Sequence, residues 1–138
     1  MRTLNKAFLK HRQDIKQRAN LAKIKLAQAV AFNLIMETPV DTSTALSNWL
    51  AGIRNPKSKK VKAHFVGIDG STHSQSSSMA YAVANTVIQR AKVGQTIFIS
   101  NSIEYINLLN QGYSKQAPVN FIELAVAKSV NQLKGMKL

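Results

Sequence analysis

Apolar residues recur at helical spacing over the first quarter of the chain and predict one long helix over residues 3–37. They fall three, four or seven positions apart, so they share one stripe, and neither Gly nor Pro interrupts them. The stripe consists of Leu4, Phe8, Ile15, Ala19, Ala22, Leu26, Val30 and Asn33. It is narrow in residues 3–20, whereas nearly every face of residues 21–36 is apolar. A helix that is apolar all round is buried, so we expect the second half to lie inside the body.

The first half of this helix is expected to project from the body. At 1.5 Å per residue the helix would be about 50 Å long, which exceeds the width of a domain of this size. Basic side chains cover the faces that the stripe leaves free. They are Lys6, Lys10, Arg12, Lys16 and Arg18. We therefore expect a single domain over residues 1–138 with residues 1–20 as a projecting basic helical arm, whose apolar stripe needs a partner such as a neighbouring copy.

Shorter patterns follow the long helix, which Pro39 ends. Helical patterns cover residues 43–47, 79–92, 103–111 and 118–134, and strand patterns cover 48–54, 61–68 and 95–100. The serine-rich segment 71–78 is expected to be a mobile loop that orders only on assembly. Helices mixed with few, short strands predict an α+β fold, in which helices pack on a small, mostly antiparallel sheet.

Several polar positions are candidates for helix caps. Asp41 and Thr42 can accept hydrogen bonds from the free amides of the turn that follows them. Asn120 and Glu123 have the spacing of a capping box, which would begin the last helix two residues later. The single tryptophan, Trp49, is expected in the core.

Composition adds a strong positive charge to this picture. The chain has 138 residues, with 19 Lys and Arg against 6 Asp and Glu, and a formal net charge of +13. Eight of the basic residues lie in residues 1–25, where Asp14 is the only acid. Such a charge attracts nucleic acid, an acidic protein face or a membrane surface, and the charge alone does not distinguish these partners. The alternative is that the basic face binds no partner and only keeps the protein solvated. A second basic group, a candidate for contacts with DNA or an acidic partner, is Arg54, Lys57, Lys59, Lys60 and Lys62.

Few residue patterns in the sequence indicate an enzyme active site. The lack of cysteine excludes a disulfide framework, a thiolate zinc site and a cysteine nucleophile. The acids are scattered, no histidine has a second ligand at helical spacing, and no glycine-rich phosphate loop is present. Asp69, His73 and the nearby serines could form a catalytic triad, although a serine-rich loop produces this composition by chance. We therefore expect no catalysis, no cofactor and no metal.

Membrane insertion and base-specific recognition are not expected either. No apolar run approaches the roughly 20 residues that span a membrane, and no export signal is expected. The few large apolar residues near the N-terminus predict weak membrane binding at most. Because no base-reading motif is present, the basic helix would contact phosphates without reading sequence.

Two segments carry an ordered set of short motifs. The first reads Thr-Pro-Val-Asp-Thr-Ser-Thr-Ala-Leu-Ser-Asn-Trp over residues 38–49. The second comprises Ile-Phe-Ile-Ser-Asn over 97–101, Tyr105, Asn-Gln-Gly ending at Gly112, Ser-Lys-Gln-Ala-Pro over 114–118, and Phe121. Placed after a long helix, this set resembles the tail-completion or neck proteins of long-tailed bacteriophages, which include minor tail protein Z-like and tail-to-head joining proteins. The chain departs at Ser43, where the family commonly has Gly, which implies a turn without positive φ or a different cap.

This resemblance implies a structural protein of the virion, assembled in the host cytoplasm and without catalytic activity. Copies in the family form a ring, usually of six, at the end of the tail tube or between the head connector and the tail. The implied partners are other copies of the chain, the tail-tube or terminator protein and the head-connector protein. DNA passes through the lumen without being read.

A ring built from head-to-tail contacts needs two complementary surfaces on each copy. We expect one surface on the arm, formed by Leu4, Phe8, Ile15 and the basic residues around them. The alternative for the second surface is an ordinary connection between two helices. We expect this second surface on a polar loop that follows an apolar cluster. Its residues are Gly112, Tyr113, Ser114, Lys115 and Gln116.

Two other functions stay open. A small nucleic-acid-binding protein would use residues 2–25 and 54–62 to contact phosphates non-specifically. A hydrolase would use a serine with His73 and Asp69, and His73→Ala would abolish its turnover.

Overall fold

The computed structural model describes residues 2–136 and contains five helices and two strands within them. In chain order they are α1 (Arg2–Glu37), α2 (Thr44–Ser47), β1 (Leu50–Ile53), α3 (His73–Ile88), β2 (Ile97–Ser100), α4 (Ile106–Asn110) and α5 (Phe121–Lys134). The arrangement is α+β, as the sequence predicts, and the long N-terminal helix has the predicted extent.

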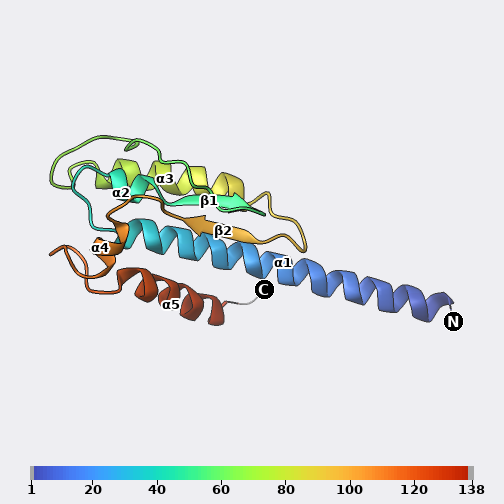
Figure 1. Cartoon of the computed structure of the whole chain (residues 1–138). Coiled ribbons are helices and arrows are strands. Elements are labelled where there is room, and N and C mark those ends of the chain that lie inside the picture. Colours follow the sequence, from blue (N-terminus) through green and yellow to red (C-terminus); the bar gives the residue numbers. More distant parts are fainter. Residues whose placement is uncertain (1, 137–138) are drawn as a thin grey trace.

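The other elements pack around the C-terminal half of α1 (Figure 1). α5 lies along one side of α1, and α3 and the two-stranded sheet lie on the other side, where α3 contacts both α1 and β1. The strands pair antiparallel, with Leu50 opposite Ser100 and Ile53 opposite Ile97. The first half of α1 extends past all of these elements toward the N-terminus.

Small side chains let α1, α3 and the sheet pack closely. Ala27 and Ala31 of α1 meet Ala84 and Ile88 of α3, and Ala51 of β1 completes this cluster. Close packing of this kind leaves no room for a larger residue without rearrangement.

A larger core lies toward the C-terminal end of α1. Its buried members include Leu34, Ile35, Leu46, Phe121 and Ala125. Trp49 belongs to this core and is 6% exposed, which confirms the prediction made from the sequence. Its Nε1 donates a hydrogen bond to Thr38 Oγ1 at 2.7 Å, so the polar atom of the ring is satisfied inside the core.

The expectation that α1 is buried on all sides in residues 21–36 is wrong. Leu21, Phe32 and Met36 are each more than two-fifths exposed. α3, the sheet and α5 cover only part of the circumference of α1, so an apolar strip stays in contact with solvent. No helix in residues 2–136 is long and apolar enough to cross a membrane.

The predicted strand over residues 61–68 does not form. Polar side chains take the place of a partner strand and bind the backbone of this irregular segment. Oδ1 of Asn48 accepts from Val61 N, and Nδ2 of Asn48 donates to Val61 O, both at 2.8 Å. Ser47 Oγ likewise accepts from His64 N at 3.1 Å. The alternation of apolar residues misleads because neither strand of the sheet pairs with this segment.

The serine-rich segment 71–78 is not a mobile loop. Its residues from His73 onward form the first turns of α3, so the helix begins six residues earlier than predicted and also ends earlier. Ser76 shares a buried stripe with Ala80, four residues on, and its Oγ accepts from Phe65 N and donates to Phe65 O, both at 3.0 Å. A buried hydroxyl is tolerated here because it is fully hydrogen-bonded.

The backbone at Ser43 has positive φ, so the expectation of a turn without positive φ is wrong. Ser43 has φ 69° and makes no side-chain cap, while its Oγ lies 2.9 Å from Thr72 Oγ1. Asp41 does not cap the following turn either, because its Oδ1 accepts from Asp69 N at 2.7 Å. Glycine adopts this conformation without strain, whereas Ser43 adopts it together with a part-buried hydrogen bond to Thr72.

The last helix begins at Phe121, the later of the two predicted starts. The capping box does not form, because Asn120 has φ 64° and its side chain caps nothing. Glu123 instead accepts hydrogen bonds from Nδ2 of Asn110 at 2.9 and 3.1 Å. Oδ1 of Asn110 accepts from Ile122 N, so the end of α4 supplies the cap for α5.

Candidate functional site

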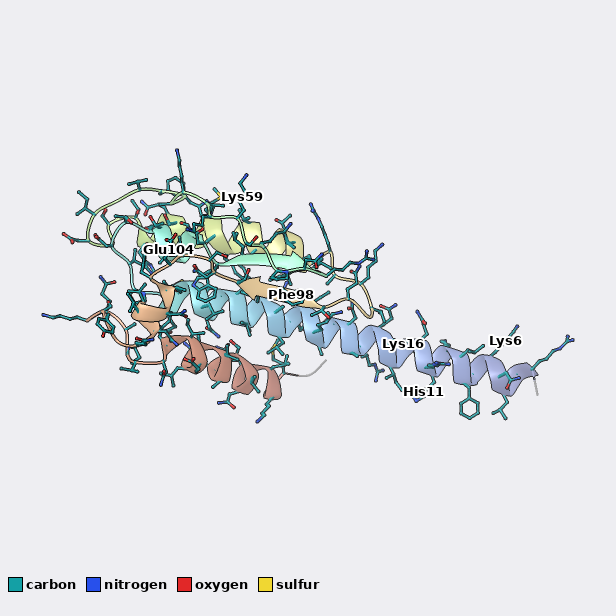
Figure 2. The ribbon with its side chains drawn as sticks, in the orientation of Figure 1. Lys6, His11, Lys16, Lys59, Phe98 and Glu104 are labelled. Carbon is teal, nitrogen blue, oxygen red and sulfur yellow. The ribbon has the colours of Figure 1, made fainter. Side chains whose placement is uncertain are left out.

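The first half of α1 is an arm without tertiary packing, which we define as residues 2–19. Every residue in this range is exposed. The body begins at Asn20, whose Nδ2 donates to Ala91 O at 3.2 Å, and at Lys23, whose Nζ donates to Lys92 O and Gln95 O. Figure 2 shows Lys6, His11 and Lys16 standing on this part of the helix, away from the other elements.

Large apolar side chains lie on the surface of the arm. Phe8 is 66% exposed, and Leu4, Leu9 and Ile15 are also exposed by more than half. Phe8, Ile15 and Arg12 border a shallow hollow on the helix surface together with Leu9. Leu9 was missed from the sequence because it lies about 100° around the helix from Phe8, outside the narrow stripe. The predicted basic residues Lys6, Lys10, Arg12, Lys16 and Arg18 are all exposed beside this apolar surface.

A second surface lies at the end of the molecule opposite the arm, and we call it the distal hollow. It has a volume of about 260 Å³ and lies between the turn after α1 and the α4–α5 loop. Its lining includes Asp41, Tyr105, Leu109, Tyr113, Ser114 and Gln116. Among the described residues that line it, Asp41 is the only charged one. Tyr113 is 75% exposed, so its ring stands largely free in solvent.

Some of the predicted loop residues line the distal hollow, and the others lie beside it. Tyr113, Ser114 and Gln116 line it, and Oε1 of Gln116 accepts from Val40 N at 2.7 Å. Gly112 has φ 97°, and a Cβ there would lie 2.7 Å from Cγ2 of Val119. Lys115 is exposed beside the hollow. The loop also connects α4 to α5, as the alternative interpretation states, and its role as a ring surface stays a prediction.

Acidic and basic side chains both lie near the distal hollow: Asp41 lines it, and the exposed Lys115 lies beside it. Burial raises the pKa of Tyr105, and the charges of Glu104 and Asp41 raise this pKa further. The hydrogen bond from Lys60 lowers the pKa of Glu104, with help from a backbone hydrogen bond and from the charge of Lys60. Glu104 forms an ion pair with Lys60, Glu37 forms one with Lys128, and Asp14 lies on the arm.

The second basic group does not join the arm. Lys59 lies over the body, far from Lys6 at the tip of the helix (Figure 2). Arg54 follows β1 with φ 72°, and its backbone N–H binds Thr96 O. Arg54, Lys57, Lys59, Lys60 and Lys62 all have exposed side chains. The chain therefore presents two separate basic surfaces.

The residues of the suspected catalytic triad do not assemble. Ser77 Oγ lies 3.4 Å from Nδ1 of His73, one turn away on α3, and Ser77 is buried. Within residues 2–136, no hydrogen bond or ion pair joins Asp69 to His73. His73 and Ser77 line a hollow of about 590 Å³ with Phe32 and Tyr81, so the groove has an apolar wall without a third catalytic partner. The described residues hold no group of three or more side chains suited to a metal ion.

The arm and the distal hollow are two exposed surfaces of different chemical character. One surface is basic and apolar, and the other is aromatic with Asp41 in its lining. Comparisons with protein-family models, with curated proteins and with solved structures found no match for the chain.

Proposed function

We propose that the chain is a structural protein of a tailed-bacteriophage virion, which forms a ring at the head–tail interface or at the tail end and completes or joins the tail. The observation that carries this proposal is the arm, which extends beyond the body with Phe8 and its apolar neighbours exposed.

The exposed apolar residues of the arm favour association. Burying a side chain such as Leu, Ile or Phe contributes about 1.5–3 kcal/mol. Leu4, Phe8, Leu9 and Ile15 together can therefore offset a substantial part of the entropy that is lost when two molecules bind. Because the arm is already helical in the monomer, it loses less conformational entropy on binding than a disordered tail would.

The motifs that carry the family resemblance meet in space. Asn101 Nδ2 donates to Ala45 O at 2.9 Å, and Val40 N donates to Oε1 of Gln116 at 2.7 Å. These bonds join residues that are 56 and 76 positions apart in the chain. This contact between the two motif groups supports treating them as one signature of the phage neck and tail-completion proteins.

A small nucleic-acid-binding protein is the second candidate. It is favoured by the arm's basic residues, all exposed, and within residues 2–136 only Lys60 and Lys128 form ion pairs with acidic side chains. A ring around passing DNA would also expose positive charge, so this feature fits both candidates. The ring is preferred because the apolar side chains on the arm have no role in binding phosphates.

The proposal is tested by imaging the purified protein in negative stain, alone and with the tail-tube protein, together with sedimentation velocity. We expect closed rings in at least one of these samples. A double variant, Phe8→Asp with Ile15→Asp, should remain a folded monomer and form no rings, because both side chains are exposed in the monomer. The matched control is Thr3→Asp with Gln13→Asp, which makes the same change of charge on the opposite face of the arm and should still assemble.

Two outcomes would contradict the ring. The first is a wild-type chain that stays monomeric in both samples. The second is tight binding of random duplex DNA by the monomer, with an affinity that falls steeply as salt rises, which would favour the nucleic-acid-binding candidate.

A further inference from the structure

We propose that the arm of one copy docks in the distal hollow of a second copy, with Phe8 against Tyr105 and Tyr113 and with Arg12 facing Asp41 and Glu104. This inference rests on the proposed function and identifies the two surfaces that make successive ring contacts. It names one occupant for the arm, a second copy of this chain.

Charge complementarity selects this pairing. The arm carries six basic residues and one acid, Asp14, so two arms brought side by side would repel each other. The distal hollow has Asp41 in its lining, and Glu104, which precedes Tyr105 in the chain, forms an ion pair with Lys60. The larger hollow between α1 and α3 is apolar, but no acidic residue lines it, and it contains His73. Of the two hollows, only the distal one offers the arm opposite charge.

Side-chain chemistry on the arm matches the lining of the distal hollow. Arg12 follows Phe8 by four positions, so the two side chains lie next to each other on the helix surface. Tyr105 and Tyr113 are exposed aromatic rings at the mouth of the hollow. Aromatic rings attract one another at their edges and faces, and an arginine binds both to the face of a tyrosine ring and to a carboxylate.

The positions of the two surfaces explain how one contact can repeat. The arm and the distal hollow lie at opposite ends of the long axis of the molecule (Figure 1). Each copy can therefore give its arm to one neighbour and receive an arm from another. Such head-to-tail contacts close into a ring when the rotation between copies is suitable. A symmetric arm-to-arm dimer would stop at two copies.

A mixing experiment distinguishes these arrangements. The arm-blocked variant is Phe8→Asp, which leaves the distal hollow intact. The end-blocked variant combines Glu104→Lys with Tyr113→Lys, two exposed positions, and leaves the arm intact. We expect each variant alone to be a folded monomer by sedimentation velocity and circular dichroism. Their mixture should form a one-to-one dimer that grows no further, because one working arm and one working hollow remain.

The outcomes separate this inference from the proposed function. If the wild type assembles and the end-blocked variant assembles equally well, the docking inference is wrong while the ring survives. If the wild type stays monomeric, alone and with the tail-tube protein, both are wrong. Assembly that disappears on nuclease treatment would assign the arm to nucleic acid and would also overturn the docking inference.

Cross-linking tests the contact directly, because the chain contains no cysteine. Leu4→Cys on the arm and Ser114→Cys at the distal hollow are mixed under mild oxidation, and a disulfide-linked heterodimer is expected. Lys6→Cys is the matched control, since it lies about 160° around the helix from Phe8 and should cross-link poorly. Disulfide dimers of Leu4→Cys with itself, without heterodimers, would indicate arm-to-arm pairing and overturn the inference.

Discussion

Trp49 is held in the core by the packing of its ring and by the hydrogen bond that its Nε1 donates. Trp49→Ala is expected to lower the free energy of unfolding by about 3–5 kcal/mol, because it leaves a large cavity. Trp49→Phe keeps much of the packing and loses mainly the hydrogen bond to Thr38, so about 1 kcal/mol is expected from that bond. Urea unfolding followed by circular dichroism measures both. A near-neutral Trp49→Ala would place this side chain outside the core.

His64 makes stability depend on pH. Burial lowers its pKa below the ordinary value of 6.5, and its buried Nε2 has no hydrogen-bond partner. The unfolded chain therefore takes up a proton more readily than the folded chain. The free energy of unfolding should fall as pH drops below 6.5, and the loss should end near the lower pKa of the folded state.

The variant His64→Gln isolates this effect. Unfolding measured from neutral pH to about pH 5 should show a shallower loss of stability in His64→Gln than in the wild type. The control is His11→Gln, since His11 is exposed on the arm. Glu104 acts at lower pH, because its pKa lies below 4.5 and its contribution is lost only as pH falls past that value. Equal slopes in wild type and His64→Gln would refute the role assigned to His64.

At the scale of elements, one serine connects α3 to the irregular segment before it. Ser76→Ala removes both hydrogen bonds to Phe65. Phe65 O keeps the hydrogen bond from Thr72 Oγ1, but Phe65 N loses its partner, so we expect a loss of about 1–3 kcal/mol in the free energy of unfolding. Ser78→Ala is the matched control two positions along, where the side chain is exposed, and should change stability little. Thermal and urea unfolding measure the difference. Equal stabilities would mean that Phe65 finds other partners at little cost.

The elements that the sequence predicts well are those with local signals. The long uninterrupted stripe of α1 and the β-rich run of β2 depend on residues close in sequence, and both appear in the structure. The start of α3 and the fate of residues 61–68 depend on which distant side chains satisfy them. Serine spacing in 71–78 resembles a loop, and its burial follows only from contacts with Phe65, which no local pattern reveals.

The arm and the body of α1 should differ in dynamics although they form one helix. Amides of residues 2–19 have only their own helical hydrogen bonds, because the side chains around them are exposed. Within residues 27–35, Ala27, Ala31, Asn33, Leu34 and Ile35 are buried. Hydrogen exchange of the monomer should therefore be fast in the arm and slow in residues 27–35. Comparable protection in both parts of the monomer would mean that the arm is packed against something.

At the scale of the whole molecule, the distribution of charge and of apolar surface gives the chain two different ends. The arm carries six basic residues and one acid, whereas Asp41 and Tyr105 line the hollow at the other end. The sequence revealed the basic arm, because its lysines and arginines are contiguous. It did not reveal the distal hollow, because Asp41 and Tyr105 are far apart in the chain and line one hollow only after folding.

This polarity predicts how association responds to salt. Contacts between the basic arm and the distal hollow lose strength as the Debye length falls from about 10 Å at 0.1 M to about 3 Å at 1 M salt. We expect sodium chloride to dissociate the complexes and the arm-blocked variant to stay monomeric throughout, as measured by sedimentation velocity. Association through apolar surfaces alone would instead strengthen in sulfate. A complex that tightens with both salts would therefore mean that Arg12, Asp41 and Glu104 contribute nothing to the contact.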